Sequence, residues 1–142
     1  MNSPAILYPM FALALWTALV LLLIPLMRIA AARRKEVTAK DFLYGESARV
    51  PPAVTIPNRN YMNLLELPML FYVVCLIIYV AGPTTSTPLY LAWGYVALRV
   101  IHSAIHLTYN NVMHRLSAFT LSNLVLVALW VTAAANVSAL HT

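Results

Sequence analysis

Four long apolar stretches constrain this chain more than any other feature. They lie at about residues 4–27, 60–81, 88–109 and 116–140, and they hold 24, 22, 22 and 25 of its 142 residues. Because an α-helix rises about 1.5 Å per residue, each stretch can cross the roughly 30 Å hydrocarbon core of a bilayer. Charged residues make up only 9% of the chain, whereas soluble domains carry about 25%. The sequence therefore predicts an all-α membrane protein, a four-transmembrane-helix up-and-down bundle, with residues 1–142 as a single membrane domain.

Basic residues are concentrated in the connection between the first two stretches. Residues 28–59 contain seven of the nine lysines and arginines and three of the four acidic residues. The positive-inside rule therefore predicts that loop 28–59 is cytoplasmic and that both termini are periplasmic or luminal. Pro51, Pro52 and Pro57 disfavour a continuous helix in this loop, so we expect the second span to begin near Pro57 and Asn58.

Polar side chains follow one face of the second and the third stretch. They are Arg59, Asn63 and Glu66, spaced i, i+4, i+7, and then Arg99, His102, His106 and Asn110, spaced i, i+3, i+7, i+11. Residues at these spacings share a helix face. A charge inside a span costs at least about 2.5 to 3.5 kcal/mol, so such residues mark functional sites. Two stripes on adjacent helices predict a shared interior site.

The two stripes match in depth. Counted from Arg59 and Asn110 at about 1.5 Å per residue, Asn63 and His106 both lie about 6 Å deep, with Glu66 and His102 at about 10 and 12 Å. Arg99 is expected within reach of Glu66. Two more arginines, Arg28 and Arg115, end the first span and open the fourth, at the mouth of the same half. We expect a net-positive cavity that opens to the cytoplasm.

Each of these residues has a simpler interpretation. Glu66 and Arg99 could form a purely structural ion pair, and Arg28, Arg59 and Arg115 could be interfacial anchors. The i, i+4 spacing of His102 and His106 is compatible with a metal, but the segment HSAIH lacks the acid of an HExxH motif and no third ligand is secured. No metal site is predicted.

The pattern resembles the MAPEG family, the membrane-associated proteins in eicosanoid and glutathione metabolism. The resemblance rests on Arg59-x-x-x-Asn63-x-x-Glu66-x-Pro68, on Arg99-Val-Ile-His102 and on Arg115. It implies a four-helix bundle assembled as a homotrimer, with glutathione as co-substrate between adjacent subunits in the cytoplasmic half. It also implies that Asn63, Glu66 and His102 hold the peptide, that Arg28 and Arg59 hold its carboxylates, and that Arg115 stabilises the thiolate.

Three positions depart from the catalytic members that this pattern resembles. His106 stands where they have a tyrosine, Leu116 replaces a serine after the catalytic arginine, and Phe119 replaces a tyrosine near the site. Each change removes a hydroxyl donor that could contact glutathione. Binding is therefore better supported than any particular reaction.

The preferred function is a membrane glutathione transferase or peroxidase that acts on a lipophilic electrophile or hydroperoxide. Its glutathione contacts are expected from Arg28, Arg59, Asn63, Glu66, Arg99, His102 and His106, with Arg115 as the catalytic residue. The expected partners are glutathione, the lipophilic second substrate, membrane lipid and two further copies of the chain, with no nucleic acid. A non-catalytic protein that binds a lipid or a partner is the alternative. A small proton-coupled transporter built on Glu66 is disfavoured by the apolar periplasmic halves of the spans.

Overall fold

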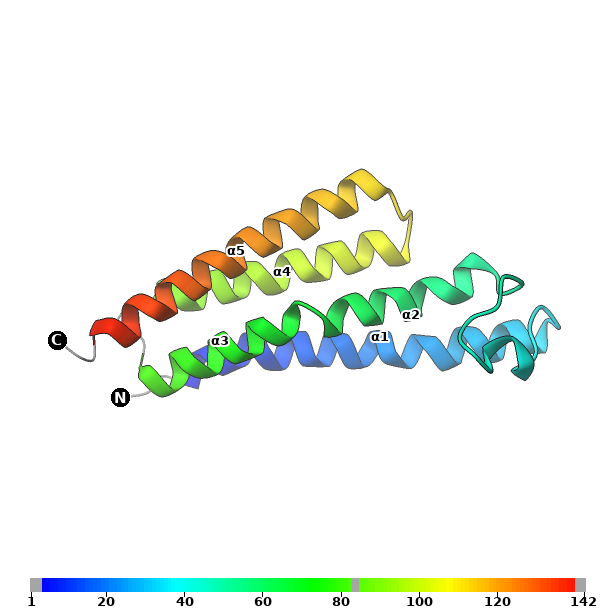
Figure 1. Cartoon of the computed structure of the whole chain (residues 1–142), viewed down its shortest axis with the longest axis horizontal. Coiled ribbons are helices and arrows are strands. Elements are labelled where there is room, and N and C mark those ends of the chain that lie inside the picture. Colours follow the sequence, from blue (N-terminus) through cyan, green and yellow to red (C-terminus); the bar gives the residue numbers. More distant parts are fainter. Residues whose placement is uncertain (1–3, 83–84, 140–142) are drawn as a thin grey trace.

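The computed structural model describes residues 4–82 and 85–139, and this part of the chain is helical without strands. Its elements are the short 3-10 helix η1 (Pro4–Ile6), α1 (Leu7–Arg33), the 3-10 helix η2 (Ala39–Phe42), α2 (Pro52–Leu65), α3 (Pro68–Ala81), α4 (Thr87–Leu107) and α5 (Val112–Ala139). Because α2 and α3 follow one another along a single bent segment, these elements form the four antiparallel segments of an up-and-down bundle (Figure 1). The predicted fold class is confirmed.

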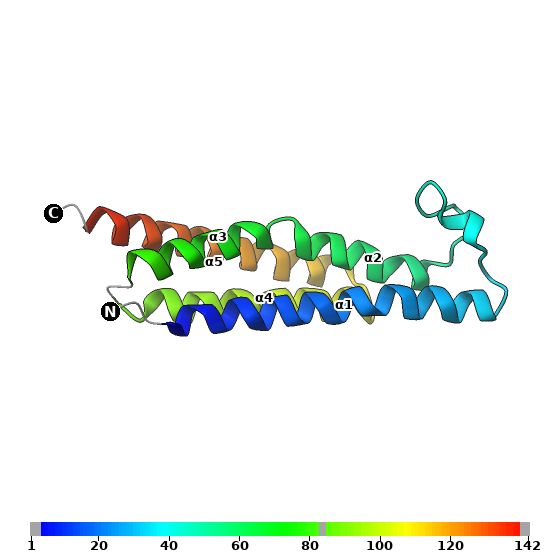
Figure 2. The same cartoon turned by 90° about the horizontal axis from the view of Figure 1, so that it is seen from below.

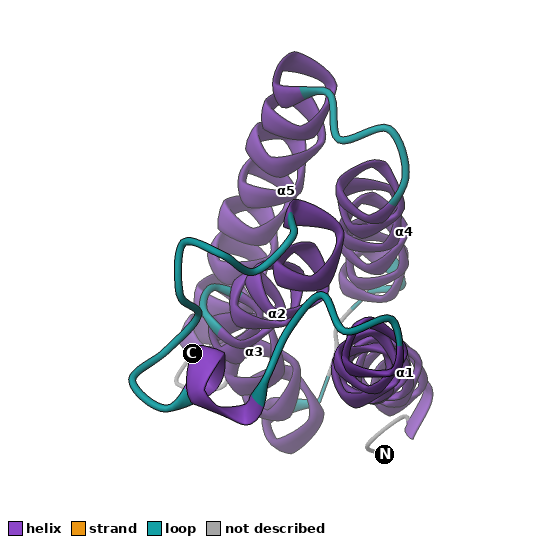
Figure 3. Ribbon diagram, turned by 90° about the vertical axis from the view of Figure 1, so that its right-hand side faces the viewer, coloured by secondary structure: helices purple, strands orange, loops and turns teal. Residues whose placement is uncertain are grey.

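The two ends of the bundle differ. The start of α1 and the end of α5 lie at one end, and the connections 34–51 and 108–111 lie toward the other (Figures 1 and 2). We call the latter the loop end. Viewed from there, the 34–51 connection folds over the ends of α1 and α2, while α5 lies on the far side of the bundle from α1 (Figure 3).

Two helices extend beyond the predicted spans. The helix that contains the first predicted span, α1, continues past residue 27 to Arg33 with Pro25 inside it. The second segment begins at Pro52 rather than near Pro57. Proline is well suited to the first turn of a helix, where its missing N–H would have no partner, and Pro57 is then accommodated as a buried residue inside α2. The connection consequently shrinks from 28–59 to 34–51.

The break between α2 and α3 has a local cause. Pro68 has no N–H, so the carbonyl of Leu64 loses its i+4 donor, and α3 begins afresh with Pro68 in its first turn. Glu66 lies at the break with φ −74° and ψ −99°, outside helical values. The predicted second span is therefore two helices rather than one.

Burial in this bundle is inverted relative to a soluble protein. Large apolar side chains such as Leu15, Leu22 and Leu124 are about 60% exposed, whereas Arg99 and Ser103 are completely buried. Three segments are long and apolar enough to cross a membrane, namely Pro4–Arg33, Pro52–Ala81 and Val112–Ser138. The helix at the expected third span, α4, is not among them by composition, and it carries four of the eight buried polar residues of the described chain, namely Arg99, His102, Ser103 and His106. The protein is an integral membrane protein.

Helix packing leaves one pair of neighbours apart. The most extensive contacts join α4 to α5 and α1 to α2, and α5 also packs on α3, but the backbones of α5 and α2 do not come close to one another. At the α3–α4 contact, the rings of Phe71 and Tyr95 stack with centroids 4.6 Å apart. Between the helix break and the end of the bundle that holds the termini, the core around Phe71 and Tyr95 closes the bundle. Between the break and the loop end, α2 and α5 diverge (Figure 1).

Candidate functional site

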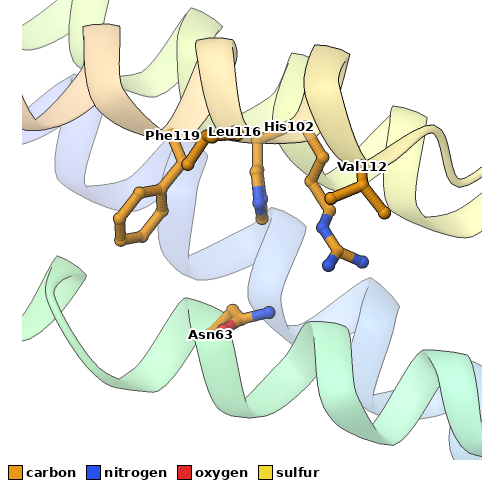
Figure 4. Close-up of a pocket in the computed structure, with 6 residues that line it drawn as sticks. Asn63, His102, Val112, Leu116 and Phe119 are labelled. Carbon is orange, nitrogen blue, oxygen red and sulfur yellow. The ribbon is translucent and has the colours of Figure 1, made fainter.

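Two adjoining cavities fill the space between α2 and α5. The deeper one, of about 230 Å³, is lined by Asn63, His102, Val112, Arg115, Leu116 and Phe119. The one nearer the loop end, of about 460 Å³, is lined by Ile56, Asn58, Arg59, Met62, Asn63, His106, Asn110, Val112 and Arg115. Because they share Asn63, Val112 and Arg115, they form one cleft. Asn63 lies on the α2 side of the deeper cavity, with His102 and Phe119 across from it (Figure 4).

His106, Asn110 and Arg115 form a hydrogen-bonded cluster in the wall of the larger cavity. The Asn110 Oδ1 atom lies 2.9 Å from His106 Nδ1 and accepts a hydrogen bond of 2.8 Å from Arg115 Nη1. The same Arg115 nitrogen lies 3.1 Å from His106 Nδ1 and 3.5 Å from His106 Nε2. The cluster therefore holds the Arg115 guanidinium directly beside the imidazole ring.

Two adjacent asparagines explain why the chain turns at this point. Asn110 follows α4 with φ +46°, a left-handed conformation that asparagine tolerates better than most residues. The Asn111 Oδ1 atom accepts hydrogen bonds from the backbone N–H groups of Met113 and His114, at 3.0 and 3.1 Å, and so caps the start of α5. This tight turn brings Arg115, in the first turn of α5, back beside His106 in the last turn of α4.

Arg99 is buried beside the helix break. Its Nη2 atom donates a hydrogen bond to the backbone carbonyl of Asn63, in the last turn of α2, and its Cζ lies 5.6 Å from the centre of the Phe119 ring. The carbonyl end of a helix is partially negative, which favours a cation there. The Nε and Nη1 atoms have no hydrogen-bond partner. Arg99 thus caps α2 from inside the bundle, and two of its donor atoms remain free.

His102 faces the deeper cavity. It is 3% exposed, its ring lies 5.9 Å from that of Phe119 and 6.2 Å from that of His106, and its Nδ1 atom has no hydrogen-bond partner. A buried polar atom without a partner is costly, and such atoms often mark where a ligand or water binds. His102 is therefore available to a molecule in the cleft.

Three of the predicted site residues line neither cavity, namely Arg28, Glu66 and Arg99. Glu66 is exposed at the break and lines neither cavity. The expected Glu66–Arg99 ion pair is absent, since the two ion pairs within the described chain join Arg28 to Glu46 and Arg34 to Glu36. The helix break turns Glu66 out of the face that a continuous helix would give it. Arg28 contacts Glu46 at 3.2 Å and lies over the Phe42 ring at 4.5 Å, so it is held by the 34–51 connection.

The sequence reasoning missed the contact that fixes one wall of the cleft. Asn60 on α2 donates a 2.5 Å hydrogen bond to Ser103 on α4, and both residues are fully buried. The signal was present, because Asn60 precedes Asn63 by three residues and Ser103 precedes His106 by three. The role of Asn110 as the bridge between His106 and Arg115 was also missed.

The cleft is positively charged. Arg59 and Arg115 line it, and no carboxylate is among the lining residues of either cavity. The described chain contains no group of three or more histidine, cysteine, aspartate or glutamate residues placed to hold a metal ion. The donors of the cleft suit an anionic, hydrogen-bonding ligand.

Comparison with known proteins identifies the family. No curated protein and no solved structure gives a match. The family model of the MAPEG family matches residues 6–135, which include α2, α4 and the part of α5 that lines the cleft. The agreement of this match with the bundle and with the polar stripes on α2 and α4 shows that the chain belongs to the MAPEG family.

Proposed function

We propose that this protein binds glutathione in the cleft between α2 and α5 and transfers it to lipophilic electrophiles, or uses it to reduce lipophilic hydroperoxides. The observation that carries the proposal is the set of donors around the cleft, where Arg59, Asn63, His102, His106 and Arg115 surround adjoining cavities of about 230 and 460 Å³. Cavities of roughly 300 Å³ and more suit ligands of this size.

The charges of the cleft match the charges of the ligand. Glutathione at neutral pH carries two carboxylates and one ammonium group. Arg59 and Arg115 supply cations inside the cleft, and Asn63 and His102 supply uncharged hydrogen-bonding groups. The ammonium requires an anion, which in this proposal is Glu66 at the helix break. In the proposed homotrimer, glutathione lies between adjacent subunits and the exposed Glu66 carboxylate faces it there.

Arg115 is proposed to stabilise the glutathione thiolate. A thiol with an ordinary pKa of about 8.5 is mostly protonated at pH 7, and an adjacent guanidinium favours its ionised form. The Asn110 and His106 contacts hold the Arg115 guanidinium in the wall shared by both cavities. Oriented charge of this kind stabilises the transition state without rearrangement.

A lipophilic substrate is proposed to arrive along α5. An apolar groove of about 480 Å³ lies between α3 and α5, with Leu67, Leu70, Leu126 and Trp130 among its lining residues. It also includes Asn123, one helical turn beyond Phe119, which lines the deeper cavity. The groove is exposed to the lipid phase and leads along this face of α5 towards the polar cleft.

Calorimetric titration with glutathione, followed by ultraviolet detection of the thiolate, tests this function. The purified wild-type protein in detergent or nanodiscs should bind glutathione, ionise its thiol and conjugate it to chlorodinitrobenzene. Arg115→Ala should lower turnover on the order of 10² to 10³-fold, as loss of one oriented charge or oxyanion donor does, and should weaken binding far less. Wild-type protein that fails to bind glutathione would refute the proposal.

Two substitutions in the cleft favour a second candidate function. Leu116 and Phe119 line the deeper cavity with apolar surface where catalytic members have hydroxyl groups. A non-catalytic protein that binds a lipid or a partner would bind glutathione weakly or not at all and would give no thiolate signal. The same titration and absorbance measurement distinguishes the two functions.

A further inference from the structure

The imidazole of His106 has a geometry that the proposed thiolate stabilisation does not use. Arg115 Nη1 lies within 3.5 Å of both ring nitrogens. The lone pairs of these two nitrogens point in diverging directions in the ring plane, so one guanidinium nitrogen cannot lie on both. Arg115 therefore packs against the face of the ring. The contact of His106 Nδ1 with Asn110 Oδ1 can then be a hydrogen bond in the ring plane.

The contact with Asn110 selects the tautomer of His106. Asn110 Oδ1 already accepts a hydrogen bond from Arg115, and an amide oxygen is an acceptor only. The 2.9 Å contact between Asn110 Oδ1 and His106 Nδ1 is a hydrogen bond when Nδ1 carries the proton. The second ring nitrogen, Nε2, then carries the free lone pair. Arg115 Nη1 lies 3.5 Å from it, above the ring.

This arrangement has the parts of an activated nucleophile site. A general base needs a lone pair that reaches the reacting group and a third group that orients its ring. Asn110 orients His106, and His106 and Arg115 line the same cavity of about 460 Å³. Arg115 cannot accept a proton, because its guanidinium stays protonated in proteins. A thiol in this cavity therefore has one neighbour that can take its proton and another that can stabilise its negative charge.

We infer that His106 is the general base that takes the thiol proton of glutathione, with Asn110 as its positioning residue. In the first step the S–H bond breaks, Nε2 of His106 receives the proton, and a thiolate forms beside Arg115. In the second, the thiolate attacks the carbon of an electrophile such as chlorodinitrobenzene and chloride leaves with the electron pair of the C–Cl bond. The imidazolium then releases its proton to water. This inference rests on the proposed function.

The charges that face His106 explain why the neutral ring is the resting form. Arg115 on α5, Arg59 on α2 and His102 one turn earlier on α4 surround the same cleft, and none of them is an acid. A neutral ring tolerates the guanidinium packed against it, whereas an imidazolium would be repelled. The thiolate formed by the transfer lies next to both cations and offsets that repulsion.

His106→Gln tests this role, since it keeps a polar side chain of similar length and removes the proton acceptor. Turnover of chlorodinitrobenzene at saturating glutathione and pH 7 should fall about 10² to 10⁴-fold, the range for loss of a general base. The dissociation constant for glutathione should rise far less than turnover falls, because Gln keeps a hydrogen-bonding group in the cleft and only the proton acceptor is lost. Added imidazole, or alkaline buffer that ionises the thiol directly, should restore much of the rate. His114→Gln is the matched control, because His114 is exposed, contacts Tyr109 and lines neither cavity.

Asn110→Gly provides a second variant that preserves the backbone. Glycine accepts the φ of +46° at this position, so the turn remains while the orienting oxygen is lost. Its turnover should fall less than that of His106→Gln. Because Asn110 also holds Arg115, the part of the loss that alkaline buffer restores reports the orientation of His106.

The outcomes separate this inference from the function on which it rests. Wild-type protein that does not bind glutathione overturns both. Wild-type protein that binds and reacts, with His106→Gln equally fast at pH 7, overturns the role of His106 alone. A slow His106→Gln protein that neither imidazole nor alkaline pH restores overturns it as well, because only a structural contact would then have been lost.

Discussion

The hydrogen bond between Asn60 and Ser103 should hold α2 against α4 and thereby set one wall of the cleft. It is 2.5 Å long, it joins residues on different helices that lie 43 positions apart in sequence, and both residues are 0% exposed. The free energy of unfolding should register its loss. Ser103→Ala removes the acceptor and leaves the Asn60 amide donor buried without a partner, which costs about 1 to 3 kcal/mol in proteins generally.

A double-mutant cycle gives the contribution of the bond itself. Interhelical hydrogen bonds in membranes couple by about 0.6 kcal/mol on average and at most by about 1.7 kcal/mol, because the unfolded chain also finds partners in the membrane. Complete burial and a short donor–acceptor distance favour the upper part of that range. We therefore expect Asn60→Ala and Ser103→Ala together to cost about 1 to 1.7 kcal/mol less than the sum of the two single changes.

Unfolding in mixed detergent micelles, followed by the fluorescence of the three tryptophans, measures these free energies. Ser117→Ala is the matched control, because its hydroxyl bonds only to the Met113 carbonyl of its own helix at 2.9 Å and is exposed. That control should add independently to either change. Additivity of Asn60→Ala and Ser103→Ala to within about 0.3 to 0.5 kcal/mol would refute the coupling between α2 and α4.

Three further predictions concern the acidic residues. Glu66→Gln should leave the unfolding free energy of the detergent-solubilised protein nearly unchanged, since Glu66 has no ion pair. The same change should weaken glutathione binding by about 1.5 to 3 kcal/mol in calorimetry. A large loss of stability would contradict the absence of a structural role for Glu66. Asp41 accepts hydrogen bonds from the Thr38 N–H, the Ser47 hydroxyl and the Thr38 hydroxyl, and these bonds hold the pKa of its carboxyl below the ordinary value. Their stabilisation of the 34–51 connection is therefore complete above pH ~3.9 and is lost as the pH falls through the lowered pKa. Hydrogen exchange of residues 38–47 should show this loss in the wild type, and Asp41→Asn should abolish its pH dependence. Glu46→Gln should destabilise the protein by less than about 1 kcal/mol in the same unfolding assay and should leave glutathione affinity unchanged in calorimetry.

The bundle could be predicted from sequence because the bilayer imposes it. Long apolar segments joined by short turns can satisfy their backbone only as antiparallel helices. The i, i+4 and i, i+3 spacings also predicted that Asn63, His102 and His106 share an interior region, and the structure brings them with Arg59 and Arg115 around adjoining cavities. Their contacts with glutathione remain a prediction.

What could not be predicted depends on departures from regular periodicity. The position of Glu66 was extrapolated along a continuous helix, but α2 ends just before this residue. The Glu66 side chain therefore points in a different direction from the one that helix periodicity predicts. Arg28 was placed at the mouth of the cavity because it ends the first apolar stretch, and its contact with glutathione was implied by the family resemblance. Its actual partner, Glu46, belongs to a connection whose folding is governed by contacts distant in sequence. Helix periodicity carries no information about either event.

The helix break that displaced Glu66 also explains how the cleft exists. Four straight, equally packed helices would bury the space between α2 and α5, yet the backbone of α5 comes close to that of α3 and not to that of α2. The break lets the second segment change course at Glu66, so that its terminal half packs against α5 while its loop-end half packs on α1 and α4. A broken helix exposes backbone carbonyls, which hydrocarbon does not tolerate, and the Arg99 hydrogen bond to the Asn63 carbonyl satisfies one of them from inside the bundle. Arg99 thereby stabilises the end of α2 that forms the cleft wall.

The same break leaves the Glu66 carboxylate exposed within a segment that is long and apolar enough to cross a membrane. A carboxylate that faces lipid is costly, and the proposed homotrimer removes the cost by placing a neighbouring subunit and the ammonium of glutathione against it.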